Sequence, residues 1–126
     1  MEKLYIKGSR KQLEISLNAE IGIMTITGVS TSENVEEYFA PVFEWLAKYE
    51  NYDKKVPAEF IFELSYFNTP TALWFTKLYA ILKNLQQKFS LKIVWYYDDD
   101  DMFNYMKEIE DLYALKVEFR EKIDNN

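Results

Sequence analysis

Four consecutive aspartates, residues 98–101, form the densest group of side chains in the sequence that could do chemistry. They follow an apolar run at 91–97, where a strand would end. Carboxylates at such a place can hold Mg²⁺ and one can act as a nucleophile, so a magnesium-dependent hydrolase is one interpretation. A calcium-binding EF-hand loop that starts at Asp98 would place Phe103 at the required glycine and Ile109 at the required glutamate. We expect the aspartates to cap and charge the next helix, with no metal bound; docking of a partner protein is the next alternative.

The turn at residues 68–71, Asn-Thr-Pro-Thr, is the second candidate. We expect Thr69 to cap a helix and Pro70 to take the first helical position, where its missing N–H costs nothing. The amides of Thr71 and Ala72 would then point toward the Thr69 hydroxyl. Helix N-termini favour anions, so this position could tolerate a phosphate on Thr69. Ordinary capping accounts for the same residues, and the turn alone does not choose between the two.

Hydrophobic periodicity predicts the elements that hold these two sites. The predicted order is β-β-β-α-β-α-β-α-β. In the first helix Pro41 should cause a kink or a restart. In the third, Met102, Met106, Ile109 and Leu112 should share one face. The predicted strands cover residues 4–6, 13–17, 21–27, 58–64, 91–97 and 116–119, and the predicted helices cover about 35–49, 70–89 and 102–113.

This order predicts the fold class. Strands that alternate with helices in the second half imply parallel crossovers. We expect an α/β protein with a STAS-like mixed β-sheet and about three helices packed on it. The length of 126 residues fits a single domain over residues 1–126, with a frayed tail at 124–126.

Composition excludes several classes of function. The sequence has no cysteine and no histidine, which removes disulfides, thiolate catalysis, Ser–His pairs and His-ligated zinc. A net charge of −6 without a basic stripe argues against nucleic acid and anionic membranes as partners. We expect no secretory signal, and the sequence contains no run of about 20 apolar residues. We therefore expect a cytoplasmic protein that needs no cofactor.

Several segments together resemble a known family. They are Tyr66-Phe67-Asn68-Thr69, Trp95-Tyr96-Tyr97-Asp98, Phe43-Glu44-Trp45-Leu46, and Gly28 before a Ser/Glu/Asn-rich turn. Over nearly the whole chain the sequence resembles the SiaC family of bacterial regulatory phosphoproteins. The resemblance implies a signalling protein that is not an enzyme, with Thr69 as its phosphorylation site.

The resemblance also implies a partner-switching cycle. A protein kinase would phosphorylate Thr69, a PP2C-like phosphatase would remove the phosphate, and the unmodified form would bind and activate a diguanylate cyclase. The output would be control of c-di-GMP and biofilm formation. The layout is similar to anti-sigma-factor antagonists as well, but their Asp-Ser-Ser-Gly turn is replaced here by Asn-Thr-Pro-Thr at 68–71, which argues against membership of that group.

The expected partner surface surrounds this turn. Trp74 is a candidate anchor in it, although a core-facing ring is an equally good interpretation. A small-ligand-binding STAS-type module and the magnesium-dependent hydrolase remain as alternative functions. The residues assigned to the surface are Tyr66, Phe67, Asn68, Pro70, Thr71 and Trp74.

Overall fold

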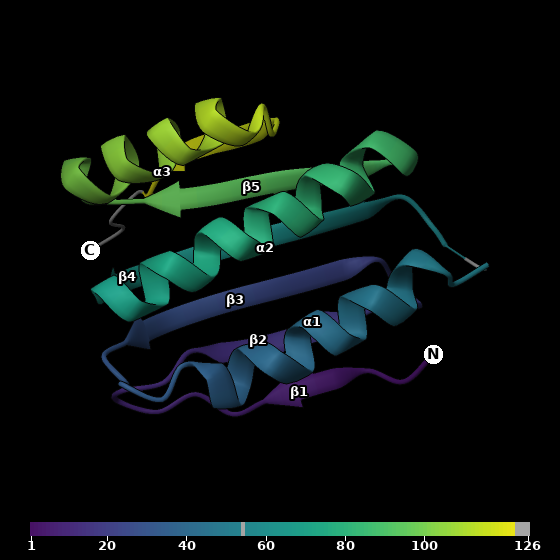
Figure 1. The fold of residues 1–126 in the computed structure, drawn as a ribbon, viewed down its shortest axis with the longest axis horizontal. Helices are drawn as coiled ribbons and strands as arrows, with labels where there is room; N and C mark the ends of the chain where they lie inside the picture. Colours follow the sequence, from purple (N-terminus) through teal and green to yellow (C-terminus); the bar gives the residue numbers. More distant parts are fainter. Residues whose placement is uncertain (54, 123–126) are drawn as a thin grey trace.

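The computed structural model describes residues 1–53 and 55–122, which form one six-stranded sheet and three helices (Figure 1). The strands are β1 (Leu4–Ile6), β2 (Glu14–Asn18), β3 (Ile23–Ser30), β4 (Ala58–Phe67), β5 (Leu91–Tyr97) and β6 (Val117–Glu121). The helices are α1 (Glu36–Glu50), α2 (Thr69–Lys88) and α3 (Asp100–Tyr113).

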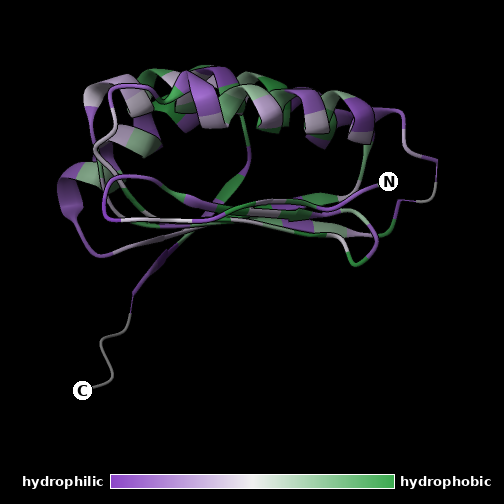
Figure 2. Ribbon diagram, turned by 90° about the horizontal axis from the view of Figure 1, so that it is seen from below, coloured by the Kyte–Doolittle hydropathy of each residue, from purple (hydrophilic) through white to green (hydrophobic). Residues whose placement is uncertain are grey.

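The strands lie in the sheet in the same order as in the chain. Strands β1, β2 and β3 pair antiparallel, and β3 to β6 pair parallel. Each parallel pair needs a crossover, which a helix supplies. Because every crossover moves one strand further in the same direction, crossovers of the usual right hand place all three helices on one face. Figure 2 shows this single helical layer over one side of the sheet.

The core lies between the helical layer and that side of the sheet. Alternate residues of β2, β3 and β4 face it, as the period of two in the sequence predicts. Each large apolar side chain removed from water in this way contributes about 1.5–3 kcal/mol before the cost of chain ordering. The fully buried apolar residues of these three strands are Ile15, Leu17, Met24, Ile26, Phe60, Phe62 and Leu64, and α2 adds Phe75, Leu78, Tyr79 and Leu82.

The predicted order of elements, the mixed sheet and the three packed helices are confirmed. Helix α1 is one segment through Pro41, so the restart that was one of the two expectations there is wrong. The predicted place of Leu112 on the apolar face of α3 is also wrong. Leu112 is 76% exposed; the apolar stripe of α3 continues from Ile109 to Tyr113, which packs against the core, because the interval of four keeps a helical residue on the same face.

The predicted fraying of residues 124–126 concerns residues outside the described part of the chain. Within the described part, no helix has the length and apolar character that a membrane crossing requires.

Candidate functional site: the groove at the first turns of α2 and α3

The two candidate sites of the sequence meet at one edge of the sheet. Strands β4 and β5 are parallel neighbours, so their carboxyl ends, and the first turns of α2 and α3 that follow, lie together (Figure 1). Such an edge is where parallel α/β sheets place their functional groups. A groove of about 340 Å³ lies between the two helix starts. It is lined by Tyr66, Phe67, Asn68, Thr69, Ala72, Asp99, Asp101, Met102 and Tyr105.

An irregularity near the end of β4 sets the direction of the aromatic side chains in this groove. Gly28 of β3 pairs with Leu64, but the next residue, Val29, pairs with Tyr66, so Ser65 is an extra residue in β4. An extra residue reverses the alternation of side chains beyond it. As a result Tyr66 is 53% exposed, whereas Phe67 packs in the core, with its ring edge-on to Phe75 at 5.2 Å between centroids.

Asn68, not Thr69, is the N-cap of α2. Its side-chain Oδ1 accepts a hydrogen bond from the Thr71 amide at 3.1 Å, and its backbone oxygen accepts one from the Ala72 amide at 3.0 Å. Its Nδ2 donates to the Ser32 oxygen at 3.0 Å. Thr69 and Pro70 are then the first two helical residues. The prediction that the Thr71 and Ala72 amides face the Thr69 hydroxyl is therefore wrong, since Asn68 uses both amides.

A chain of hydroxyl groups fixes this turn to the rest of the fold. Thr71 Oγ1 lies 2.6 Å from Asn68 Oδ1, to which it donates, and 2.6 Å from Ser30 Oγ. Ser30 Oγ is also hydrogen-bonded to the Tyr38 hydroxyl of α1. Ser30 and Thr71 are completely buried and Tyr38 nearly so. The network joins the end of β3, the first turn of α1 and the first turn of α2 in an environment where unmade hydrogen bonds are costly.

The two threonines of the turn therefore have opposite environments. Thr69 is exposed and lines the groove. Thr71 has no exposed surface, so its predicted place in a partner-contact surface is wrong. Asn68 is half-buried with its amide engaged in the turn, while Pro70 is exposed beside Thr69.

Trp74 lies on another side of α2. Its ring is half-buried and stacks on Phe39 of α1 at 5.8 Å, with an interplanar angle of 8°. Lys77 places its ammonium group 4.2 Å from the centre of the indole. Trp74 is not among the residues that line the groove. Its contacts fit the core-facing interpretation, in which it packs α2 against α1.

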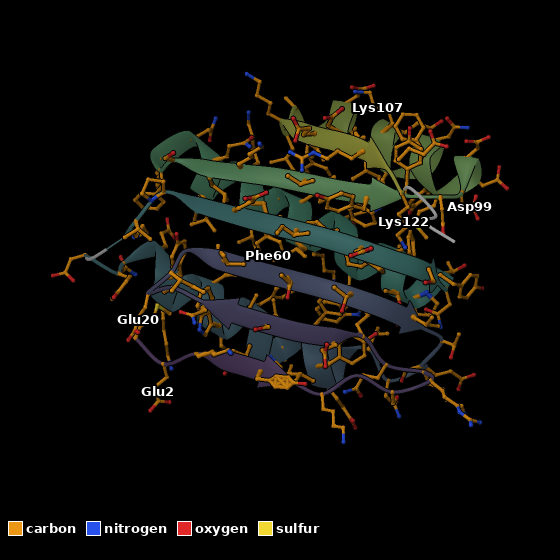
Figure 3. All side chains as sticks on the ribbon, turned by 180° about the vertical axis from the view of Figure 1, so that it is seen from behind. Glu2, Glu20, Phe60, Asp99, Lys107 and Lys122 are labelled. Atoms are coloured by element: carbon orange, nitrogen blue, oxygen red, sulfur yellow. The ribbon has the colours of Figure 1, made fainter. Side chains whose placement is uncertain are left out.

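The aspartate run forms the other wall of the groove. Asp99 is the N-cap of α3, and its Oδ1 accepts from the amides of Asp101 at 2.8 Å and Met102 at 3.3 Å. Asp98 lies 4.0 Å from the Lys122 ammonium group, and Figure 3 shows Asp99 and Lys122 at the same end of the sheet. Among residues 1–53 and 55–122, no group of three or more carboxylates is placed to hold a metal ion. The acids cap the helix, as predicted.

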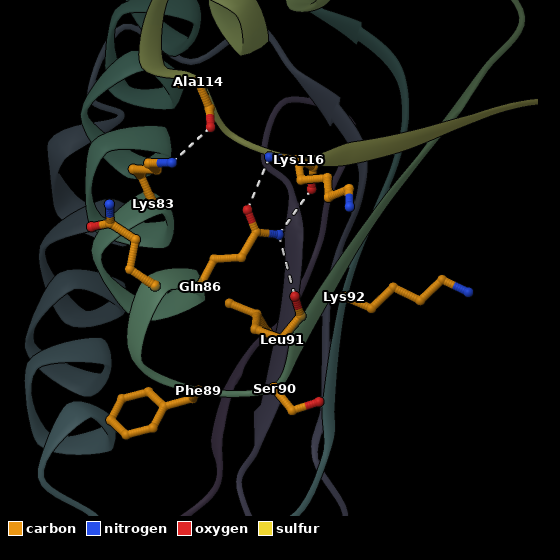
Figure 4. Close-up of a pocket in the computed structure, with 9 residues that line it drawn as sticks. Lys83, Gln86, Phe89, Ser90, Leu91, Lys92, Ala114 and Lys116 are labelled. Carbon is orange, nitrogen blue, oxygen red and sulfur yellow. Dashed lines mark hydrogen bonds between the residues drawn. The ribbon is translucent and has the colours of Figure 1, made fainter.

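A second hollow lies at the opposite end of α2, where it meets the start of β5 (Figure 4). Its volume is about 500 Å³ and its lining includes Lys83, Lys92 and Lys116. Gln86 crosses it, accepting from the Lys116 amide and donating to the Lys116 and Leu91 oxygens. Lys83 donates to the Ala114 oxygen at 2.8 Å. These bonds close the end of α3 onto the sheet, so we assign this hollow a structural role.

Comparison with known proteins identifies the family of the chain. The model of the SiaC family of regulatory phosphoproteins matches residues 6–122. The chain belongs to the SiaC family. No match was found among curated protein sequences.

Solved structures of SiaC from Pseudomonas aeruginosa share the fold. The apo-SiaC crystal structure has a TM-score of 0.83 at 22% identity, covering 95% of this chain and 99% of that chain. A second SiaC structure has a TM-score of 0.73 at 23% identity and covers both chains fully. The crystal structure of the diguanylate cyclase SiaD in complex with its activator SiaC has a TM-score of 0.83 at 21% identity, covering 94% and 99%.

Sequence reasoning missed the contribution of α3 to the groove. Asp99 and Asp101 were interpreted mainly as helix caps, and Met102 and Tyr105 were assigned to the helix without a role at the site. The signal was available, since neighbouring parallel strands bring their carboxyl ends together. Strands β4 and β5 are such a pair, and they end in the segments Tyr66-Phe67-Asn68-Thr69 and Trp95-Tyr96-Tyr97-Asp98.

Proposed function

We propose that this SiaC-family chain is a non-enzymatic cytoplasmic switch whose unmodified form binds and activates a diguanylate cyclase. A protein kinase adds phosphate to Thr69 and a PP2C-like phosphatase removes it. The cyclase as target is supported by the SiaD–SiaC complex of Pseudomonas aeruginosa, in which SiaC is the activator. The output would be the c-di-GMP level and, through it, biofilm formation.

One observation carries the choice of Thr69 as the modified residue. It is the exposed threonine at the groove, whereas Thr71, two residues further on, is fully buried and hydrogen-bonded on both sides. A kinase needs an accessible hydroxyl, and a phosphate at Thr69 breaks none of the hydrogen bonds that hold the turn.

The groove also explains how a phosphate would act. A phosphothreonine carries about −1.5 to −2 charges and three acceptor oxygens. In the first turn of α2 the amides of Thr71 and Ala72 are already bound to Asn68, and Pro70 has no N–H. The protein thus offers the phosphate little internal compensation, and Asp99 and Asp101 line the same groove. The dianion would remain at the contact surface, where a bound partner would have to desolvate it.

The difference in binding free energy that such a switch requires is small. A hundredfold loss of affinity corresponds to about 2.7 kcal/mol of differential binding. Tyr66, Pro70 and the groove around Thr69 form the proposed contact surface, with Phe67 as its floor. Asn68 holds the turn from within.

The test is phosphorylation by the cognate kinase followed by intact-mass measurement and peptide mapping. We expect one phosphate on the wild-type chain, located at Thr69, and none on Thr69→Ala. Thr31→Ala is the matched control, because Thr31 is another exposed threonine and its loop, 31–33, contacts Asn68; it should be labelled like the wild type.

Labelling of Thr69→Ala at the wild-type level would refute this assignment. Loss of labelling in Thr31→Ala alone would move the modified site to the β3–α1 loop.

A further inference from the structure

The groove combines an aromatic and apolar surface with an acidic one. Its floor and one wall are apolar or aromatic, from Phe67, Ala72 and Met102, with the rings of Tyr66 and Tyr105 on the rim. Its other wall carries the carboxylates of Asp99 and Asp101. No lysine or arginine is among its lining residues.

The two tyrosine rings on the rim are exposed to solvent. Tyr66 is 53% and Tyr105 39% exposed. The ring centroid of Tyr105 lies 6.3 Å from that of Phe67, so these two rings adjoin at the groove, and Tyr66 lines it as well. Tyrosine clusters of this kind are typical of the centre of protein interfaces.

Within the described part of the chain, neither of these two carboxylates forms an ion pair. The ion pair of the aspartate run joins Asp98 to Lys122. Asp99 uses Oδ1 for two amides of its own helix, and these bonds leave its Oδ2 available. Asp101 is exposed in the first turn. The groove therefore has a net negative charge next to aromatic faces.

We infer that the groove receives an arginine side chain of the activated target, with its guanidinium group on the tyrosine rings and paired with Asp99 and Asp101. This inference rests on the proposed function and adds the chemistry of the partner to it. Guanidinium is planar, stacks on aromatic rings and binds carboxylates through two parallel hydrogen bonds. Lysine offers a point charge without the stacking, so the geometry favours arginine.

The same occupant accounts for the effect of phosphorylation. We expect a phosphate on Thr69, which lines this groove of about 340 Å³, to take up space that the guanidinium group needs. The arginine then loses its contact with Phe67 and Met102 and with the aspartates. The phosphate excludes the partner by the space that it occupies and by the cost of removing its water. These two effects must outweigh the attraction between the phosphate and the guanidinium group.

The experiment measures binding of the purified diguanylate cyclase of the same host to unmodified protein by calorimetry. The variant Asp99→Asn/Asp101→Asn keeps a capping side chain at position 99 and removes both groove charges. Asp100→Asn/Asp111→Asn is its matched control, because both residues are exposed on α3 outside the groove lining. We expect the groove variant to bind about tenfold or more weakly and the control to stay within about twofold.

Two further readings belong to the same experiment. Raising ionic strength from about 50 to 500 mM should weaken wild-type binding more than binding of the groove variant, since screening acts on the pair that the variant lacks. Tyr105→Ala should weaken binding, and Leu112→Ala, an exposed residue of the same helix, should not.

The outcomes separate this inference from the proposed function. Equal binding by wild type, groove variant and control overturns the arginine site and leaves the switch intact. Equal weakening in both double variants overturns it too, because general charge would then explain the effect. Failure of the wild-type protein to bind the cyclase overturns the proposed function and the inference with it.

Discussion

Replacing Thr71 by valine tests the hydroxyl network that holds the switch turn. Valine has nearly the same shape and a helix propensity close to that of threonine, so the change removes mainly the hydroxyl. That hydroxyl makes two hydrogen bonds of 2.6 Å, to Asn68 and Ser30. Each neutral bond contributes about 0.5–1.5 kcal/mol, so we expect a loss of about 2 kcal/mol.

The loss stays moderate because no partner becomes isolated. Ser30 keeps its bond to Tyr38, and Asn68 Oδ1 keeps the Thr71 amide. For a domain of 126 residues, about 2 kcal/mol corresponds to roughly 8 °C in Tm. Urea unfolding and calorimetry measure both quantities.

Thr69→Val is the matched control, with the same chemical change two residues away. Thr69 is exposed and takes no part in the network, so its variant should stay within about 0.5 kcal/mol of the wild type. Equal stability losses in the two variants, or no loss in Thr71→Val, would refute the account of the turn.

Three other substitutions test separate parts of the fold. Burial raises the pKa of Tyr79, and its hydroxyl has no hydrogen-bond partner within the described residues. Tyr79→Phe should therefore keep or raise the free energy of unfolding, and a loss above about 1 kcal/mol would contradict this. The hydrogen bond from Lys88 lowers the pKa of Glu50 below its ordinary 4.5. The wild type should therefore be more stable than Glu50→Gln above about pH 4.5, and this advantage should disappear as the pH falls through the lowered pKa. An advantage that persists in acid would count against the ion pair. Gly28 has φ of 105° with nothing within 4 Å of an added Cβ, so Gly28→Ala should cost about 1–2 kcal/mol in thermal unfolding through backbone strain alone, and an unchanged Tm would argue against that strain.

The order of elements was predictable because each strand and helix carries its own period. The alternation of Ile15 and Leu17, and the intervals of three and four from Phe75 to Leu82, depend on local chain geometry. The extra residue in β4 was not predictable, since nothing in the composition of Leu64-Ser65-Tyr66 distinguishes a regular strand from a bulged one.

The identity of the N-cap was missed for a related reason. Asn68 and Thr69 are adjacent and are both good capping residues, so local preference cannot choose between them. The choice depends on bonds from Asn68 to Ser32 and from Thr71 to Ser30, which join segments more than thirty residues apart. The family resemblance predicts Thr69 as the modified residue, and the structure adds that Thr69 is exposed.

The central claim is that a phosphate on Thr69 switches partner binding off. The most direct measurement compares the affinity of unmodified protein and of protein stoichiometrically phosphorylated at Thr69 for the same purified cyclase, by calorimetry at one salt concentration. We expect the phosphorylated form to bind about a hundredfold more weakly, equivalent to about 2.7 kcal/mol, and to regain affinity after phosphatase treatment. Equal or tighter binding by the phosphorylated form would contradict the claim.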